Sequence, residues 1–278
     1  MCRLFGFRSV IKSQVHTSLV EAKNALIVQS GHHSDGWGVG YYVEQVPHII
    51  RSVEAALEDK LFKHVSGVVA SETVLAHLRK ATNGEKLILN THPFQHGRWV
   101  FAHNGNIKDF EQYRDALKSR IHPTLSRYIL GETDSEIIFF LILTHMMKTI
   151  SFHESRIEID HLKKAVDHAV DEIVKLCGDY ETLDGEPDKT YLTFIITNGS
   201  TMLAFQGGKT LKYSTHKDNC LERDSCSYFA QQCENPTLSG FVNHLVFSSE
   251  SLKGQNIWND INPGQMIGID WRMNIKIY

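Results

Sequence analysis

Strand-like and helical segments occupy separate blocks along this 278-residue chain, and their order leaves few arrangements open. Short runs rich in Val, Ile, Tyr and Phe indicate strands; they cover residues 3–9, 38–43, 66–78, 98–103, 191–197, 202–205, 211–214, 245–248 and 266–270. Apolar residues at helical spacing predict helices over 17–30, 109–119, 137–147 and 157–176. Strands, then helices, then strands, without a repeat or a flexible linker, predict a single α+β domain with layered sheets over residues 2–278.

Local signals place several of the element ends. The strand over 98–103 ends at Asn104-Gly105, a strong turn signal. The sequence Thr-Asp-Ser-Glu at 133–136 has the pattern of a capping box before an apolar helix. Segments 178–189 and 215–237 are polar, and we interpret them as surface loops rather than domain boundaries.

The charge and hydropathy of the chain argue against two classes of partner. Its 29 Lys and Arg residues nearly balance 32 Asp and Glu, which gives no general attraction to nucleic acid or to an anionic membrane. The longest apolar run, 137–143, is seven residues, whereas a membrane-spanning helix needs about 20. Arginines at positions 3 and 8 occupy the place of a signal peptide's apolar stretch. We therefore expect a cytoplasmic protein that binds neither nucleic acid nor membrane.

The cysteines do not form a recognisable framework. There are five, an odd number, and no two are spaced as Cys-x-x-Cys, so neither a disulfide scaffold nor a zinc site is expected. The spacing of Cys220, Cys226 and Cys233 fits no common metal site, and we interpret them as free thiols in a loop.

Cys2 is the most informative single residue. Removal of the initiator Met would make it the first residue. That one residue would then carry both a thiol, on its side chain, and a free α-amine, on its backbone. Such an amine has a pKa of about 7.7–8.0 and can take the thiol proton, so the residue would carry its own base. The alternative is an incidental cysteine at the start of a strand, and position alone does not separate the two.

Three further clusters carry groups that could bind a carboxylate, an oxyanion or an ammonium group. Arg79 offers a planar fork that matches a carboxylate, with the Thr82 hydroxyl close by in sequence; the plainer alternative is a surface ion pair. Asn104 and the N–H of Gly105 could converge on one oxygen, as an oxyanion requires, or could simply form a turn. Asp134 could bind an ammonium group, or could cap the helix that follows it.

Taken in order, the motifs resemble those of one family. They are Cys-Arg-Leu at 2–4, Ser-Asp-Gly-Trp-Gly at 34–38, Leu-Arg-Lys-Ala-Thr-Asn-Gly at 78–84, Thr-His-Pro-Phe at 91–94, His-Asn-Gly at 103–105 and Glu-Thr-Asp-Ser-Glu at 132–136. This series resembles the class II glutamine amidotransferases of the stand-alone type, and residues 247–252 resemble the family's later strand and turn. The resemblance implies an N-terminal-nucleophile hydrolase: a four-layer αββα sandwich with two antiparallel sheets.

The resemblance also implies a role for each candidate residue. Cys2 would be the nucleophile, and Asn104 with Gly105 the oxyanion hole. Arg79 and Thr82 would hold the substrate α-carboxylate, and Asp134 (from Glu-Thr-Asp) the α-ammonium. Many members have Trp and His where this chain has Lys80 and Asn83, so closure of the pocket over the substrate need not follow the family pattern.

Three functions remain to be distinguished. The first is hydrolysis of the γ-amide of glutamine, or of another γ-glutamyl amide, through a Cys2 thioester, with no metal or organic cofactor and with a synthase or hydrolase subunit as a candidate partner. The second is an acylase of apolar amides, which a test of penicillin V against glutamine would reveal. The third is a non-catalytic glutamine-binding or scaffold subunit, which permanent retention of the initiator Met would favour.

Overall fold

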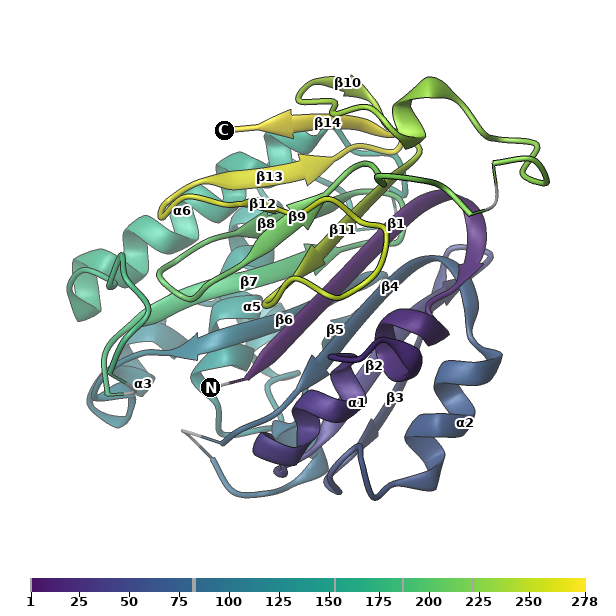
Figure 1. The fold of residues 1–278 in the computed structure, drawn as a ribbon. Helices are drawn as coiled ribbons and strands as arrows, with labels where there is room; N and C mark the ends of the chain where they lie inside the picture. Colours follow the sequence, from purple (N-terminus) through teal and green to yellow (C-terminus); the bar gives the residue numbers. More distant parts are fainter. Residues whose placement is uncertain (1, 82–83, 153, 187, 222) are drawn as a thin grey trace.

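The chain forms two antiparallel sheets packed face to face (Figure 1). The computed structural model describes residues 2–81, 84–152, 154–186, 188–221 and 223–278. The first sheet contains, in spatial order, β12 (Asn259–Asp260), β9 (Lys212–Ser214), β11 (His244–Ser248), β1 (Arg3–Gln14), β4 (Ala70–Leu78), β2 (Trp37–Val43) and β3 (Val46–Ser52). The second contains β10 (Gly240–Phe241), β14 (Asn274–Ile277), β13 (Met266–Ile269), β8 (Met202–Phe205), β7 (Tyr191–Thr197), β6 (Trp99–Asn106) and β5 (Phe94–His96).

Helices cover the outer face of each sheet, so the molecule has four layers (Figure 1). On the first sheet lie α2 (Lys60–Val68) and the short α1 (Leu26–Gln29). On the second lie α3 (Phe110–Lys118), α5 (Asp134–Met146) and α6 (Ile159–Cys177). Shorter helical segments are a π-helix at Thr17–Glu21, α4 at Pro123–Ser126, and 3₁₀ turns at Ser30–His32, Ile88–Asn90 and Gln231–Cys233. This arrangement confirms the α+β domain that the sequence pattern predicts and the αββα sandwich that the family resemblance implies.

The alternation of side chains along β1 explains the layering. Leu4 belongs to the core between the two sheets, whereas its neighbours Phe5 and Phe7 belong to the core beneath the helices. Successive residues of a strand point to opposite faces, so a strand buried on both faces is apolar throughout. Gly6 faces the inner layer, where an added Cβ would lie 3.0 Å from the Ile195 side chain.

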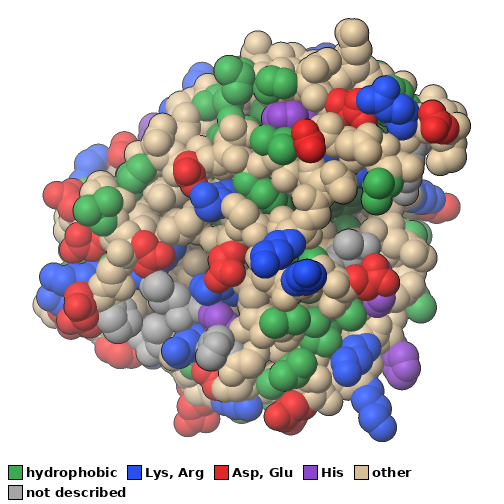
Figure 2. Space-filling view, in the orientation of Figure 1, with side chains coloured by type: hydrophobic (Ala, Val, Ile, Leu, Met, Phe, Trp, Pro, Cys, Tyr) green, Lys and Arg blue, Asp and Glu red, His purple; other side chains and the backbone are tan. Residues whose placement is uncertain are grey.

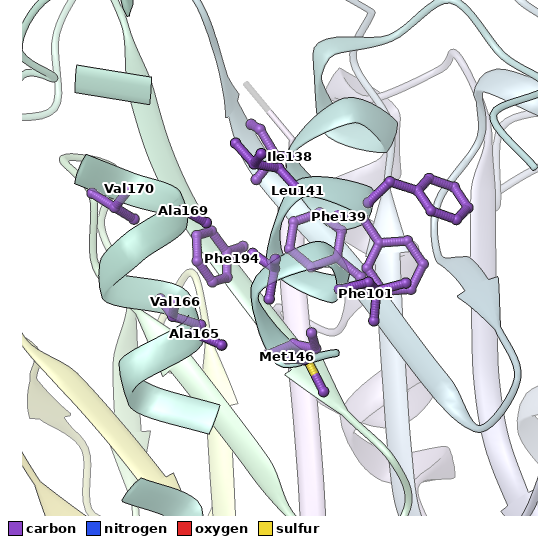
Figure 3. Packing of buried hydrophobic residues seen from close by; sticks show 14 of the residues in the cluster. Phe101, Ile138, Phe139, Leu141, Met146, Ala165, Val166, Ala169, Val170 and Phe194 are labelled. Atoms are coloured by element: carbon purple, nitrogen blue, oxygen red, sulfur yellow. The ribbon is translucent and has the colours of Figure 1, made fainter. Parts of the chain in front are cut away.

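The central helix of the second outer layer is α5. It is apolar on all sides over 137–143, which suits a helix enclosed by a sheet and other helices. Figure 3 shows Phe139 of α5 against Phe101 and Phe194 of the sheet; Phe101 lies 5.3 Å from Phe139 and 5.2 Å from Phe194, between ring centroids. Val166 and Ala169 of α6 belong to the same cluster.

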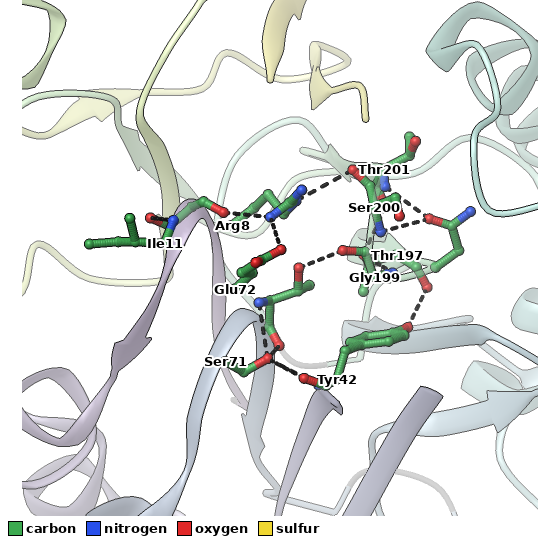
Figure 4. A network of polar contacts seen from close by, with 12 residues as sticks. Arg8, Ile11, Tyr42, Ser71, Glu72, Thr197, Gly199, Ser200 and Thr201 are labelled. Atoms are coloured by element: carbon green, nitrogen blue, oxygen red, sulfur yellow. Dashed lines mark hydrogen bonds and ion pairs between the residues drawn. The ribbon is translucent and has the colours of Figure 1, made fainter. Parts of the chain in front are cut away.

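A polar network ties the two sheets together at one end of the sandwich (Figure 4). The buried Tyr42 hydroxyl on β2 lies 3.1 Å from the carbonyl oxygen of Thr197, the last residue of β7. Close by, the Thr73 hydroxyl donates to the carbonyl oxygen of Gly199 at 2.6 Å, and the Arg8 guanidinium donates to that of Ser200 at 3.4 Å. These bonds fix how one sheet lies over the other.

The structure corrects two of the predicted elements. Residues 17–30 do not form one helix: Ala25 is extended, and the Asn24 side chain bonds to the backbone of Ser251 and Lys253, so long-range contacts override the helical spacing. Residues 66–68 end α2 rather than begin a strand, because Asp59 caps a helix that starts at Lys60 by accepting from the Leu61 N–H. The helices predicted over 109–119, 137–147 and 157–176 correspond to α3, α5 and α6.

On the face drawn in Figure 2, basic side chains are interspersed with acidic ones. No helix in the described ranges is both long and apolar enough to cross a bilayer. Within those same residues, no group of three or more His, Cys, Asp or Glu side chains is placed to hold a metal ion.

Candidate active site

The pairing of β1 with β4 brings Cys2 beside Arg79. The register pairs Arg3 with Leu78, so Cys2 lies next to Arg79 just beyond the end of both strands. The Cys2 Sγ accepts a hydrogen bond from the Lys80 N–H at 3.2 Å. The thiol thus lies just before the start of β1, beside the point where the chain leaves β4.

Opposing effects act on the Cys2 thiol. Burial raises its pKa, whereas the Lys80 N–H and the Arg79 guanidinium partly offset this, and the Asp134 carboxylate raises it further. The charges of Arg79 and Asp134 both act on the sulfur, so the structure brings these three predicted residues into one region. A thiol with a raised pKa is protonated at neutral pH and needs a base before it can attack.

Arg79 is buried at 3% exposure, and its guanidinium organises the loop that follows it. It donates to the carbonyl oxygens of Gly84 at 3.1 Å and Glu85 at 3.0 Å. The Asp35 carboxylate accepts from the Ala81 N–H at 2.9 Å and so holds the same loop from the other side. Arg79 is therefore no surface cation. Thr82 and Asn83, in the middle of this loop, lie outside the described residues.

Asn104 and Gly105 lie within the last three residues of β6, in the opposite sheet. The turn predicted at this pair is wrong, because Asn104 pairs with Thr193 and Gly105 with Leu192, and the strand continues to Asn106. The Asn104 side chain is buried and lines a cavity of about 390 Å³, which Arg3 and Ser249 also line. A Cβ at Gly105 would lie 2.1 Å from the Tyr191 carbonyl oxygen, so no other residue fits without moving the backbone. Because β6 contacts both β1 and β4, the pair lies across the sandwich from the strands that carry Cys2 and Arg79.

Asp134 connects the start of α5 to the segment that follows β6. One carboxylate oxygen accepts from the Ile107 N–H at 2.7 Å, and the other from the Ser135 N–H at 2.7 Å. The residue that caps α5 is Thr133, whose hydroxyl accepts from the Glu136 N–H at 3.3 Å. The Glu136 carboxylate accepts from Leu130 and Gly131 N–H groups, so only half of the predicted capping box forms.

A cluster of buried histidines beside these residues was not predicted. His103 lies between the Ser135 hydroxyl and the Tyr191 carbonyl oxygen, each at 2.9 Å from a ring nitrogen. A carbonyl only accepts, so the nitrogen that faces Tyr191 carries the proton. His77 bonds to the His103 carbonyl oxygen at 3.1 Å, and its ring lies tilted against that of His92, with 4.2 Å between the ring centroids. Burial lowers the pKa of His77 to about 3 and also lowers that of His92 and His103, so the cluster is neutral.

The sequence held one usable signal for this cluster. His77 precedes Arg79 by two residues on a strand and therefore shares its face, and His103 precedes Asn104 directly. Their mutual contacts, however, cross from one sheet to the other, and no spacing along the chain reports such a distance.

Comparison with known proteins settles the family. The family model described as "Glutamine amidotransferases class-II" matches residues 1–271. The chain belongs to this family.

Similarity to individual members is partial in sequence and extends over the whole fold. A Haemophilus influenzae protein described as a putative glutamine amidotransferase is 31% identical over 73% of this chain and 62% of its own length, so this chain spans less than two thirds of that relative. A Mycobacterium tuberculosis protein named as a gamma-glutamyl-hercynylcysteine sulfoxide hydrolase is 38% identical over 38% of this chain and 50% of its own. The structure of a glutamine aminotransferase class-II domain protein from Silicibacter pomeroyi aligns over 100% of this chain and 98% of its own, with a TM-score of 0.62 and 20% identity, and shows the same fold.

Proposed function

We propose that this class II amidotransferase hydrolyses the γ-amide of glutamine, or of a related γ-glutamyl amide, through a thioester on Cys2. The observation that carries the proposal is the position of Cys2: it lies beside a buried Arg79 and within the field of Asp134, with Asn104 and Gly105 across the sandwich. These groups match the parts of a γ-glutamyl amide: a carbonyl to attack, an α-carboxylate and an α-ammonium.

In the first half of the reaction, the α-amine of Cys2, freed by removal of Met1, takes the thiol proton. The thiolate attacks the γ-carbonyl carbon, and its oxygen becomes an oxyanion that the Asn104 amide and the Gly105 N–H stabilise. A donor of this kind contributes about 10²–10³ in kcat. The C–N bond then breaks, and the α-ammonium returns its proton to the departing ammonia or amine.

In the second half, water attacks the γ-glutamyl thioester, with the α-amine as base. The C–S bond breaks, glutamate leaves and the thiol is restored. The chemistry uses side chains, the Gly105 N–H and the α-amine, and needs no metal or organic cofactor.

Recognition of the amino-acid end rests on Arg79, Thr82 and Asp134. Asp134 would be the anionic partner of the α-ammonium; its carboxylate already accepts from the N–H groups of Ile107 and Ser135, which hold it in place. Arg79 would bind the α-carboxylate through its planar guanidinium, and Thr82 would add its hydroxyl.

The substrate range is part of the proposal. The relative named for hydrolysis of a γ-glutamyl compound supports substrates beyond glutamine. We further propose a cytoplasmic protein that acts on a small molecule, alone or with a synthase or hydrolase subunit.

The test is a product-detected screen with protein whose first residue is Cys2. Glutamine and a set of γ-glutamyl amides are incubated with it, and glutamate is measured by mass spectrometry, with penicillin V as an apolar amide. Glutamate release that requires Cys2 supports the proposal. Cleavage of penicillin V alone would indicate an apolar acylase, and binding of glutamine without turnover would indicate a non-catalytic subunit.

A further inference from the structure

The cavity that Asn104 lines lies beside Cys2 on the side away from Arg79. At this end of the first sheet the strands follow one another as β9, β11, β1 and β4 (Figure 1). Arg79 directly follows β4, whereas the cavity is bounded by Lys212 at the start of β9, by the turn after β11, and by the first residue of β1. Neither Arg79 nor Asp134 is among the described residues that line it.

This placement provides a separate site for the leaving group of an amide. The acyl chain and the nitrogen are attached to different sides of the carbonyl carbon, so a substrate whose glutamyl part reaches Arg79 directs its nitrogen toward the cavity. Ammonia, which glutamine releases, is about the size of a water molecule, and a water takes up about 30 Å³ in the liquid. The cavity, of about 390 Å³, is in the usual range for small-molecule sites and has room for a larger amine.

The wall of the cavity is polar throughout. The described residues that line it are two basic, two acidic, three with a hydroxyl group, and Asn104. An apolar amine would displace water from these groups without replacing its hydrogen bonds. The wall therefore favours an amine that carries further polar or charged groups.

The two acidic residues of the wall are held by neighbouring cations. The Asp184 carboxylate lies 2.9 Å from Nζ of Lys209, whose side chain is only 3% exposed. The same Nζ lies 3.4 Å from the centroid of the Tyr191 ring, and breaking such a buried pair is costly. Glu250 forms an ion pair with Arg3. Neither carboxylate is thus well placed to exchange its partner for a substrate ammonium.

Lys212 differs, because its partner is open to solvent. It pairs with Asp260 of β12, whose side chain is 74% exposed, whereas that of Lys212 is 26% exposed. An ion pair with so exposed a member contributes little to stability, so a substrate carboxylate can take the place of Asp260. Lys212 lies two strands from β1, or about 10 Å, a distance that its side chain and the amine part of a substrate can span together.

We propose that this cavity binds the leaving amine and selects γ-glutamyl amides of α-amino acids, with the carboxylate of the amino acid on Lys212. This assignment rests on the function proposed above and names its substrate class. The C–N bond that breaks is then the one between the γ-carbonyl carbon and the amino-acid nitrogen. One water is consumed, and glutamate and a free α-amino acid are released.

Binding to full-length Cys2→Ala tests the assignment without turnover. γ-Glutamylalanine and γ-glutamylalaninamide differ only in the carboxylate of the amine part, and calorimetry measures both affinities. The first should bind at least about fivefold more tightly, between the effects usual for an exposed and for a buried charged pair. Equal affinities, or no binding of either compound at millimolar concentration, would overturn the proposal.

Three variants on the same background locate the effect. Lys212→Gln should bring the two affinities together. Asp260→Asn keeps the lysine and removes its surface partner, so the difference should persist; its loss there would show that the ion pair itself sets the difference, and would overturn the proposed contact. The control is Lys276→Gln, a lysine of the other sheet that pairs with Asp160 and lies off the cavity wall, and it should also preserve the difference.

Turnover separates this assignment from the proposed function. Protein that begins at Cys2 should hydrolyse γ-glutamylalanine with a kcat/KM at least about fivefold above that for γ-glutamylalaninamide. Glutamate release from glutamine with equal values for the two amides would support the thioester function and refute the site for the leaving amine. A difference in affinity without glutamate release from any of the three compounds would support the site and refute the thioester function.

Discussion

Replacing Asp134 by Asn should lower both the stability of the fold and the selection of substrates by their α-amine. The carboxylate accepts from the N–H groups of Ile107 and Ser135, each at 2.7 Å. An amide of the same shape keeps one oxygen, so one of these buried N–H groups would face an NH₂ group instead. Losing a hydrogen bond to a charged group costs about 1.5–3 kcal/mol. For a chain of this size, that corresponds to a fall in Tm of roughly 3–10 °C.

The same substitution should reduce kcat/KM for glutamine by about 10- to 150-fold, since the α-ammonium loses a charged partner. Unfolding in urea measures the first effect. Steady-state kinetics with glutamine and with its analogue lacking the α-amine measure the second. The analogue should be a much poorer substrate than glutamine for the unmodified enzyme, and should lose little further on Asp134→Asn.

Thr133→Ala is the matched control at the same helix start. It removes the hydroxyl that caps α5 and should cost about 1 kcal/mol of stability, but it leaves the carboxylate in place. Its preference for glutamine over the analogue should therefore be unchanged. Equal penalties for the analogue on the unmodified enzyme and on Asp134→Asn would show that Asp134 never contacts the amine.

Four other changes test separate parts of the site and the fold. Cys2→Ala should abolish glutamate release without lowering Tm, and full activity in this variant would remove the proposed nucleophile. Arg79→Lys should raise KM for glutamine about tenfold or more, because lysine keeps the charge but loses the planar fork; saturation kinetics identical to those of the unmodified enzyme would contradict the proposed contact. Gly105→Ala should be destabilising by several kcal/mol, since its Cβ would lie 2.1 Å from the Tyr191 carbonyl oxygen, and an unchanged urea midpoint would refute this. Burial lowers the pKa of His244 from its ordinary value of 6.5 to about 4 in the folded protein. As the pH falls, the unfolded chain therefore protonates this imidazole before the folded protein does, and the free energy of unfolding decreases between pH 6.5 and pH 4. The histidine contributes up to about 1.4 kcal/mol per pH unit to this dependence of stability on pH. Urea unfolding of His244→Gln between pH 4 and 6.5 should therefore show a weaker pH dependence, and an unchanged dependence would exclude His244 as a cause.

The sequence predicted the layers well because their signals are local. The unbroken apolar run 137–143 needs a fully enclosed helix, and Thr133 starts that helix as its spacing indicates. The 17–30 segment failed for the opposite reason. Its helical spacing is real, but Asn24 bonds to residues 251 and 253, and no pattern within the segment reports so distant a partner.

In the candidate site, too, the residues with a local signal could be predicted and the contacts between distant elements could not. Cys2, Arg79, Asn104 and Gly105 were predicted because each carries a group of recognisable chemistry within a motif that resembles the family, and their roles stay predictions. The contacts of His103 could not be predicted, since its partners Ser135 and Tyr191 come from other elements that only the fold brings together.

The sandwich also explains how the thiol proposed as the nucleophile can be held in place ahead of the first strand. Residues near a terminus ordinarily fray. Cys2, however, precedes a strand that is paired on both sides, with β4 and β11, over most of its first half. The bonds of Tyr42, Thr73 and Arg8 to the β7–β8 turn then fix the second sheet, and with it Asn104, relative to that strand. The distance between the thiol and the proposed oxyanion donors is therefore set by sheet packing rather than by loops. We expect that weakening the far-end network alters the proposed catalysis at Cys2 without changing any residue placed against the substrate.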